Sequence, residues 1–344
     1  MVASQVVAVT GVSGVLGQRL LPLLDASPRV ERVIGLDVRD PARRARKLEF
    51  HRIDVIGTDL APYLRNVGVV VHLAAVLGPL PDESLYRRVN LDGTRHVLGA
   101  ASVAGVHKIV RPSSVAVYGA WENNPVPLTE DAPLRPSPGY LPAIIDAECE
   151  RLLVAWAAAQ AGRVATRLRI APVLGSGADS LLAHVATGRF PVRVRGAAAP
   201  VQVVHVDDAA AALELATTQD LDGAYNVAAD GWLTAPEARA LAGAPARPPM
   251  PLELAARTLA STWSVGLGDA PASVLPYLRY STVVANDRLK LTGWKATHPN
   301  DETILLAPDT GARRVVPWLI GAGAVTAGVV LGAWWLTRRS RAAR

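Results

Sequence analysis

Three glycines near the N-terminus have the spacing of a turn that binds phosphate. In the stretch "VTGVSGVLGQRL", Gly11, Gly14 and Gly17 follow an apolar run and precede a helical pattern. The first glycine permits a tight turn, the second lets the backbone approach a pyrophosphate, and the third lets helix and strand pack closely. The N–H groups that open the helix then face the phosphates. This spacing predicts a dinucleotide site.

An acidic residue supports this site and indicates which dinucleotide it takes. Asp37 ends the next apolar run, about twenty residues after Gly17, where a carboxylate can bind a ribose 2′-hydroxyl. A carboxylate there would repel the 2′-phosphate of NADP, so NAD is favoured. Arg39 lies two residues further on and weakens that preference. We therefore expect NAD as the cofactor and regard NADP as the weaker alternative.

Apolar runs alternate with helical patterns over the first two-thirds of the chain, and these elements must position the site. Four runs have the pattern of buried strands: Gln5–Gly11, Glu31–Val38, Val67–Ala75 and Val106–Ser114. The alternation predicts an α/β fold with a Rossmann-like doubly wound parallel sheet, covered on both faces. We expect a dinucleotide-binding domain over residues 1–175, with later contributions near 200–230. The irregular, proline-rich stretch after it predicts a smaller substrate-side subdomain or lid over 176–312.

The order of the motifs resembles one known family. The glycine turn is followed by "VHLAA" (Val71–Ala75), "VNLDGTRHVL" with Asn90, "PSSVAVYG" and "LRIAPVLGSG" (Leu168–Gly177). This succession resembles the extended short-chain dehydrogenases/reductases, the NAD-dependent epimerase/dehydratase group, over residues 5–300. The resemblance implies three further cofactor contacts: the adenine with Asp54 and Val55, the ribose with Ala74 and Ala75, and the nicotinamide with Pro172 and Val173.

The resemblance also implies two catalytic hydroxyls, but a third catalytic residue is missing. Ser114 and Tyr140 match the catalytic serine and tyrosine of the family. In the family, a lysine follows the tyrosine by four residues on one helix face, where it lowers the tyrosine pKa and binds the nicotinamide ribose. Here that position is Ile144. A nearby cation is worth about one to three pKa units, so its loss could slow proton transfer by a factor on the order of 10 to 1000.

The missing lysine leaves two interpretations of function open. One is an NAD-dependent oxidoreductase or epimerase in which Ser114 and Tyr140 assist hydride transfer, with a distant arginine as one replacement for the lysine. The candidates for that replacement are Arg87, Arg88 and Arg135. The other interpretation is a catalytically inactive NAD-binding scaffold or sensor. The enzyme is favoured because the cofactor motifs and both hydroxyls are kept.

One further substitution bears on the substrate. Nucleotide-sugar enzymes of this group typically carry an arginine for the diphosphate at the position that aligns with Val201. Its absence favours an apolar hydroxy or keto compound, sterol-like or isoprenoid-like, and leaves a nucleotide-sugar epimerase or dehydratase as the second alternative. Arg193 and Arg195 could supply another contact to an anion.

The C-terminal end has the pattern of a membrane anchor. From Val315 to Thr337 the chain runs for 23 residues without a charge. As a helix this segment would be about 34 Å long, enough to cross a hydrocarbon core of roughly 30 Å. Arginines flank it on both sides, and tryptophans lie near its ends, as at a membrane interface. We expect a single-pass transmembrane helix over 315–337 and a basic tail over 338–344. The main domain would then be cytoplasmic, at the cell membrane and in contact with lipid.

Composition narrows the remaining classes. Half of the chain is hydrophobic and 19% is charged, which excludes a disordered protein. The net charge of +6 comes without an arginine-rich stripe interleaved with aromatics, so we expect no nucleic-acid partner. No cluster of His, Cys and carboxylates has metal-ligand spacing, so no metal is expected. The single cysteine, Cys149, fits a reducing compartment. A homo-oligomer is left open.

Overall fold

Seven parallel strands form the central sheet of the computed structural model, which describes residues 4–178, 180–268 and 270–307. The strand order is β3-β2-β1-β4-β5-β6-β9. The order reverses between β1 and β4, which is the switch point at which ligands bind in doubly wound folds. The predicted α/β class with a Rossmann-like parallel sheet is confirmed. The strands are β1 Gln5–Thr10, β2 Val30–Asp37, β3 Leu48–Arg52, β4 Val69–His72, β5 Lys108–Ser114, β6 Val164–Ile170 and β9 Gly223–Val227.

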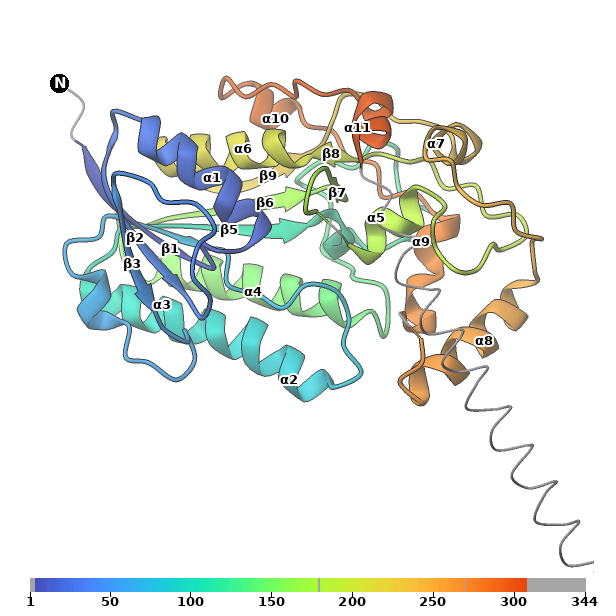
Figure 1. Ribbon diagram of the computed structural model, residues 1–344, viewed down its shortest axis with the longest axis horizontal. Helices are drawn as coiled ribbons and strands as arrows, with labels where there is room; N and C mark the ends of the chain where they lie inside the picture. The colour runs from blue at the N-terminus through green and yellow to red at the C-terminus, as the bar shows by residue number, and fades with distance from the viewer. Residues whose placement is uncertain (1–3, 179, 269, 308–344) are drawn as a thin grey trace, which may run out of the picture. The chain divides into compact units, whose positions relative to one another are not determined.

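Helices cover both faces of the sheet. Figure 1 shows α1 (Val15–Ala26) and α6 (Val206–Thr218) on one face, with α3 (Gly93–Ala104) and α4 (Leu141–Ala158) on the other. Successive residues of β1 point to opposite faces, so Val7 and Val9 pack with α1 and α6 whereas Ala8 packs with α3 and α4. Burial on both faces explains why the strands are continuous apolar runs in the sequence.

Several further elements gather beyond the carboxyl ends of the strands (Figure 1). A two-stranded parallel sheet pairs β7 (Val173–Leu174) with β8 (Val204–His205). An apolar cluster that includes Tyr140, Phe190 and Tyr277 lies in this region, with residues of α5 (Leu181–Ala186), α8 (Leu252–Ser264) and α9 (Pro276–Arg279). The other helices are α2 Glu83–Arg87, α7 Ala235–Leu241, α10 Asp287–Lys290 and α11 Asn300–Leu306.

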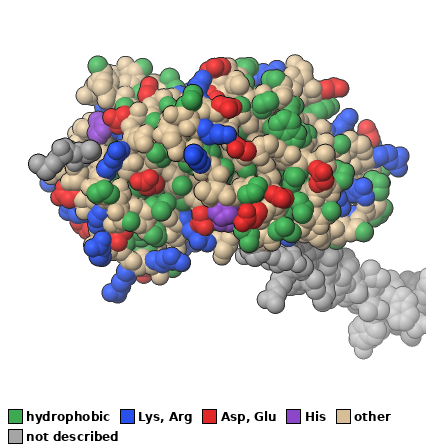
Figure 2. All heavy atoms as spheres, turned by 90° about the horizontal axis from the view of Figure 1, so that it is seen from above, with side chains coloured by type: hydrophobic (Ala, Val, Ile, Leu, Met, Phe, Trp, Pro, Cys, Tyr) green, Lys and Arg blue, Asp and Glu red, His purple; other side chains and the backbone are tan. Residues whose placement is uncertain are grey.

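The described chain up to Ala307 forms one compact unit. The domain boundary expected near residue 175 lies inside this unit, between β7 and α5, and the division there stays a prediction. None of the helices within the described ranges is long and apolar enough to cross a membrane. The expected transmembrane segment, 315–337, and the basic tail, 338–344, lie outside the described residues. On the face that Figure 2 shows, basic and acidic side chains are interspersed.

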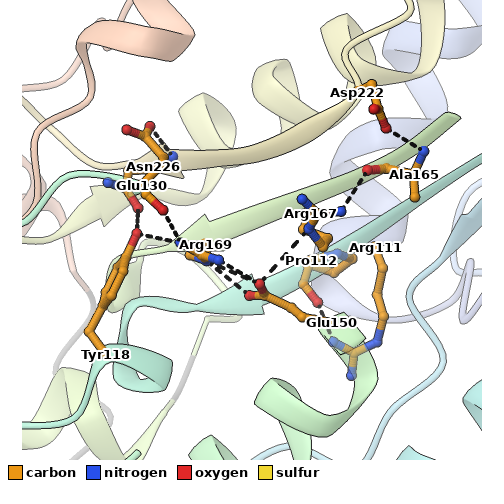
Figure 3. A network of polar contacts seen from close by, with 10 residues as sticks. All are labelled: Arg111, Pro112, Tyr118, Glu130, Glu150, Ala165, Arg167, Arg169, Asp222 and Asn226. Atoms are coloured by element: carbon orange, nitrogen blue, oxygen red, sulfur yellow. Dashed lines mark hydrogen bonds and ion pairs between the residues drawn. The ribbon is translucent and has the colours of Figure 1, made fainter. Parts of the chain in front are cut away.

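A buried polar network ties α4 to the middle of the sheet (Figure 3). The Arg169 guanidinium on β6 donates to both carboxylate oxygens of Glu150 on α4, at 2.8 to 3.1 Å. It also donates to the Tyr118 hydroxyl at 2.8 Å, and that hydroxyl donates to Oδ1 of Asn226 on β9 at 2.7 Å. Arg169 and Glu150 are 6% and 3% exposed. Burial acts to lower the pKa of Arg169, but the bonds to Glu150 outweigh it and raise that pKa above its usual value.

Removing one partner of this ion pair should destabilise the protein strongly. In Glu150→Gln the Arg169 charge stays buried without a counter-charge, so the free energy of unfolding should fall by about 3–5 kcal/mol. The matched control is Glu49→Gln, which removes an exposed ion pair with Arg32 (N···O 2.9 Å) and should cost about 1 kcal/mol or less. Urea denaturation measures both. Equal losses in the two variants would contradict the structural role of Glu150.

Candidate functional site

One cleft of about 770 Å³ brings together the residues that the sequence predicts for the site. It lies at the carboxyl ends of the strands around the switch between β1 and β4. The expected cofactor contacts that line it are Gly11, Gly14, Gly17, Asp37, Asp54, Val55, Ala74, Ala75, Pro172 and Val173, and the expected catalytic residues are Ser114 and Tyr140. Their common location is a structural fact, and their individual roles stay predictions.

The turn between β1 and α1 leaves no room for side chains at two of its glycines. Gly11 has a φ of +72°, and a Cβ there would lie 2.6 Å from the backbone N of Ala74. A Cβ at Gly17 would lie 2.5 Å from the carbonyl oxygen of Val12, so this glycine packs against the turn itself. Gly14 occupies the N-cap position of α1 and lines the cleft. The N–H groups of the first helical turn are therefore available to a diphosphate.

The loop after β4 is held against this turn from two sides. Oγ1 of Thr10 accepts a hydrogen bond from the N–H of Ala74 at 3.2 Å. Asn90 forms two bonds with the backbone of Val76: its Oδ1 accepts from the N–H at 2.8 Å, and its Nδ2 donates to the carbonyl at 3.0 Å. These bonds fix the loop that carries Ala74 and Ala75 along the cleft wall.

The carboxylate of Asp37 is placed by backbone groups at the end of β2. Its Oδ2 accepts from the N–H of Ser13 at 2.9 Å, and its Oδ1 accepts from the N–H of Arg39 at 3.0 Å. A carboxylate offers about four lone-pair sites, so acceptor capacity remains for ribose hydroxyls. Asp54 accepts from the N–H of Ile56 at 2.9 Å, and Val55 beside it is buried. These residues, with the glycine turn, fit a dinucleotide such as NAD.

Tyr140 lies in an environment that keeps its hydroxyl protonated. It occupies the N-cap position of α4, is 3% exposed, and packs against Tyr277 with ring centroids 5.0 Å apart. Burial raises the pKa of Tyr140 well above its usual value, and Tyr277, Tyr86 and Asp146 raise it further. Because every one of these influences raises the pKa, Tyr140 is a neutral phenol near neutral pH.

The predicted substitutes for the lysine do not act on Tyr140. Ile144 is half-buried and is not among the described residues that line the cleft. Arg87 and Arg88 are exposed, and Arg135 lies over the ring of Trp121, 5.8 Å from its centroid. None of the three contributes to the pKa of Tyr140. None of the three is among the described residues that line the cleft either, so replacement by one of these arginines stays a prediction without structural support.

Sequence reasoning missed three polar residues on the wall of the cleft. Arg111 on β5 is 6% exposed, and its guanidinium donates to Oδ1 of Asp146 on α4 at 3.0 Å. The hydroxyl of Ser113, two residues along the same strand, is buried and has no hydrogen-bond partner among the described residues. All three line the cleft. An arginine inside the apolar strand "KIVRPSS" was the available signal, because a buried arginine requires a partner.

His72 at the end of β4 also lines the cleft and is a neutral imidazole. Thr94 Oγ1 donates its hydrogen to the carbonyl of Asn90 at 2.6 Å, so Nε2 of His72, 3.1 Å away, must donate to Thr94. Nδ1 then accepts from Oγ1 of Thr10 at 2.7 Å. Burial, assisted by Arg111, lowers the pKa of His72 to about 3. This histidine is therefore a structural hydrogen-bond link and not a base near neutral pH.

A second cavity of about 300 Å³ adjoins the cleft, and the two share Pro172 and Leu182 on their walls. Val201, where nucleotide-sugar enzymes carry an arginine, is 6% exposed and lines this cavity. Arg193 and Arg239 also line it. Within the described residues, no group of three or more His, Cys, Asp or Glu side chains could hold a metal ion.

Comparison with known proteins identifies the family. The sequence profile of the NAD dependent epimerase/dehydratase family matches residues 7–228. A 3-diazoavenalumate denitrifying reductase from Streptomyces sp is 32% identical over 321 residues, which is 86% of this chain and 97% of that protein. An uncharacterized protein of Mycobacterium tuberculosis is 32% identical over 259 residues, 72% of this chain and 68% of that protein. The UDP-glucose 4-epimerase of Thermus thermophilus in complex with NAD has a similar fold, with a TM-score of 0.68 and 24% identity, over 90% of this chain and 100% of that one.

The chain belongs to the NAD-dependent epimerase/dehydratase family, as the order of its motifs predicted. The predicted cofactor, NAD, is confirmed with it. Members of this family are typically enzymes, and the expected cofactor contacts line the cleft described above.

The neutral His72 should make the folded protein less stable in acid. Its folded pKa of about 3 lies below the ordinary value near 6.5. Between these pH values the unfolded chain binds a proton that the folded chain does not, so stability falls by about 1.4 kcal/mol per pH unit as the pH drops. His72→Gln cannot bind this proton. The free-energy difference between wild type and this variant should therefore shrink from pH 7 to pH 4 in urea denaturation. A constant difference would contradict a neutral, buried His72.

Proposed function

We propose that this protein is an NADH-dependent reductase that acts on a compact, largely apolar carbonyl compound bound beside Tyr140. The observation that carries this proposal is the state of Tyr140. Reduction of a carbonyl consumes a protonated acid, whereas oxidation of an alcohol starts from the deprotonated base. Tyr140 is buried, has a raised pKa and lacks the lysine, so its abundant form is the one that reduction uses.

The residues of the cleft divide the work of binding and proton transfer. The glycine turn and the start of α1 bind the diphosphate of the cofactor, and Asp37 accepts hydrogen bonds from the adenosine ribose. Ser113 and Asp146, which line the same cleft as Tyr140, would offer the nicotinamide ribose the polar contacts that the lysine provides elsewhere in the family. NADH, when bound in this cleft, would supply the hydride for the carbonyl carbon and become NAD⁺. Tyr140 donates the proton to the carbonyl oxygen with Ser114 as a second hydrogen-bond donor, and water returns the proton to Tyr140.

One comparison supports reduction over epimerisation. A relative that matches 86% of this chain and 97% of its own length is named as a reductase, whereas relatives that match shorter parts of the chain include two named as UDP-glucose 4-epimerases. An epimerase that works through a keto intermediate must begin by oxidising its substrate, which requires Tyr140 as a base. The nucleotide-sugar alternative is weakened further by Val201, since its side chain offers no charge to a diphosphate. The apolar wall of the second cavity suits an apolar substrate, and its small volume favours a compact molecule over a sterol.

Two substitutions test the role of Tyr140. Tyr140→Phe should lower kcat for ketone reduction by about 10²–10⁴ and leave the Kd for NAD⁺ unchanged, because only the proton donor is lost. Asp37→Ala should raise the Kd for NAD⁺, measured by calorimetry, and leave kcat at saturating cofactor unchanged. The assay follows NADH consumption with cyclohexanone, acetophenone and cinnamaldehyde as trial acceptors. Bound NAD⁺ with no turnover of any carbonyl compound would favour the inactive scaffold, and turnover of UDP-glucose would favour the epimerase.

Restoring the lysine should change the pH profile. In the wild type, kcat/KM for reduction should stay level from about pH 6 to pH 9, because Tyr140 remains protonated. In Ile144→Lys a cation near Tyr140 should move the alkaline fall of this profile to lower pH by about one to three units. Ile144→Met is the uncharged control and should keep the wild-type profile. Identical profiles in all three proteins would remove Tyr140 from the proton-transfer step.

We further propose that residues 315–337 anchor this catalytic unit to the cell membrane as a single-pass helix, with the main domain in the cytoplasm. The proposal rests on the charge-free length of the segment and its flanking arginines. The full chain should remain in the membrane fraction after alkaline carbonate extraction, whereas residues 1–312 should be released. Release of the full chain by carbonate would refute a spanning anchor.

A further inference from the structure

The second cavity has a mostly apolar wall with positive charge at one side. Its apolar lining includes Phe190, Val192 and Val201. The polar groups of Gln202 are already occupied, since its Nε2 donates to three carbonyls and its Oε1 accepts from the N–H of Val284. Among the described lining residues there is no aspartate or glutamate. The charged groups that remain available to a ligand are therefore arginines.

Three arginines in this region lack a counter-charge within the described chain. Arg239 on α7 donates to the carbonyls of Gly188 and Pro245 at 3.2 and 3.3 Å, and Arg193 donates to the carbonyl of Arg247 at 3.3 Å. Arg247 in turn donates to the carbonyl of Phe190 at 2.9 Å. None of the three forms an ion pair with a carboxylate of the described residues. Burial lowers the pKa of Arg239, and the charges of Arg193 and Arg247 lower it further.

A glycine allows Arg239 to lie close to the backbone beside the cavity. Gly188 has a φ of +70°, and a Cβ there would lie 2.4 Å from Cγ of Arg239 and 2.6 Å from one of its guanidinium nitrogens. The glycine therefore makes space for the arginine to cross the backbone between α5 and Phe190. Mutual repulsion of three unpaired cations would be relieved by one bound anion.

We propose that the substrate of the reductase carries an anionic group, a carboxylate in the first instance, which Arg193 and Arg239 hold in this cavity. The apolar body of the substrate packs along Phe190 and Val192. Its carbonyl reaches the cleft where the two spaces meet, at Pro172 and Leu182. The substrate class is thus a compact apolar keto or aldehyde acid. The reduction of such a substrate rests on the proposed reductase function, whereas the binding of its anionic group does not.

The position of the charge separates this substrate from a nucleotide sugar. In this chain the position that aligns with the diphosphate-binding arginine of the nucleotide-sugar enzymes is the apolar Val201. Its backbone pairs with Leu233 through two hydrogen bonds of 2.8 Å. The cations come instead from residues 193 and 239. A cavity of about 300 Å³ lies at the lower end of the roughly 300–1,000 Å³ range of ligand sites, which suits a small acid.

Matched acids and amides test the site directly. The full chain, in detergent and saturated with NAD⁺, is titrated by calorimetry with benzoate, cinnamate and 1-naphthoate, and with the amide of each acid. At least one acid should bind about tenfold or more tighter than its amide, because the two share a shape and differ in charge. This preference should weaken as ionic strength rises. Equal binding of acids and amides, or no binding of any acid to the NAD⁺-loaded protein, would overturn the proposal.

Arginine variants locate the charge. Arg193→Gln and Arg239→Gln should each weaken acid binding about tenfold or more and leave amide binding and the Kd for NAD⁺ unchanged. Arg239→Lys keeps the charge and should retain part of the affinity. Arg257→Gln, on an exposed part of α8 and outside the lining of the cavity, is the control for net charge and should have no effect. An equal loss in Arg257→Gln would refute a localised site.

The same titrations separate this proposal from the reductase function. One outcome is acid binding that depends on Arg239, while the protein oxidises no NADH in the presence of 4-oxocyclohexanecarboxylate or phenylglyoxylate. That result would support the anion site and reject the reductase function. Reduction of neutral ketones, with no preference for acids over amides, would keep the reductase and reject the anion site.

Discussion

The structure of the cofactor cleft depends on a close approach between two loops. The turn after β1 meets the loop after β4 so tightly that a single Cβ at position 11 would collide with the backbone of Ala74. Three side chains hold the two loops in place. Thr10 and Asn90 accept hydrogen bonds from the loop after β4, and Asp37 accepts one from the N–H of Ser13 in the turn after β1. The switch in strand order then opens the cleft between these loops. A dinucleotide site is the direct result.

The electrostatic character of the two adjoining spaces differs. The part of the cleft near Tyr140 contains a neutral phenol, a neutral imidazole and an Arg111–Asp146 pair whose charges balance. The second cavity carries unbalanced positive charge among its described lining residues. In the first space, burial determines which groups can exchange protons, whereas in the second space the proposed anion site would select ligands by charge. On that proposal, a substrate is positioned by its charge without that charge lying beside the reacting carbon.

The sequence predicted the fold, and residues that line the cofactor half of the cleft, because the signals are local in the sequence. The spacing of the glycines and the place of Asp37 at a strand end can be recognised without knowing that Gly11 lies against Ala74 or that Asp37 accepts from Ser13. The catalytic half is not local. Arg111 and Asp146 meet across the gap between β5 and α4, and the second cavity is built from residues between 115 and 283. For the same reason the sequence suggested Arg87, Arg88 and Arg135, which are not among the described residues that line the cleft. The burial that raises the pKa of Tyr140 likewise depends on Tyr277, which no local pattern connects to it.

The buried bond between Glu150 and Arg169 also bears on how this active site could have diverged. It fixes α4 to β6 well beyond the first turn of the helix, where Tyr140 and Ile144 lie. The ion pair that fixes α4 to the sheet is thus separate from the first turn of the helix, which carries the proposed proton donor. A lineage could exchange the residue at position 144 without losing the helix, the sheet or the cofactor cleft. Replacement of a lysine at this position would then alter reactivity without a large change in the stability of the fold.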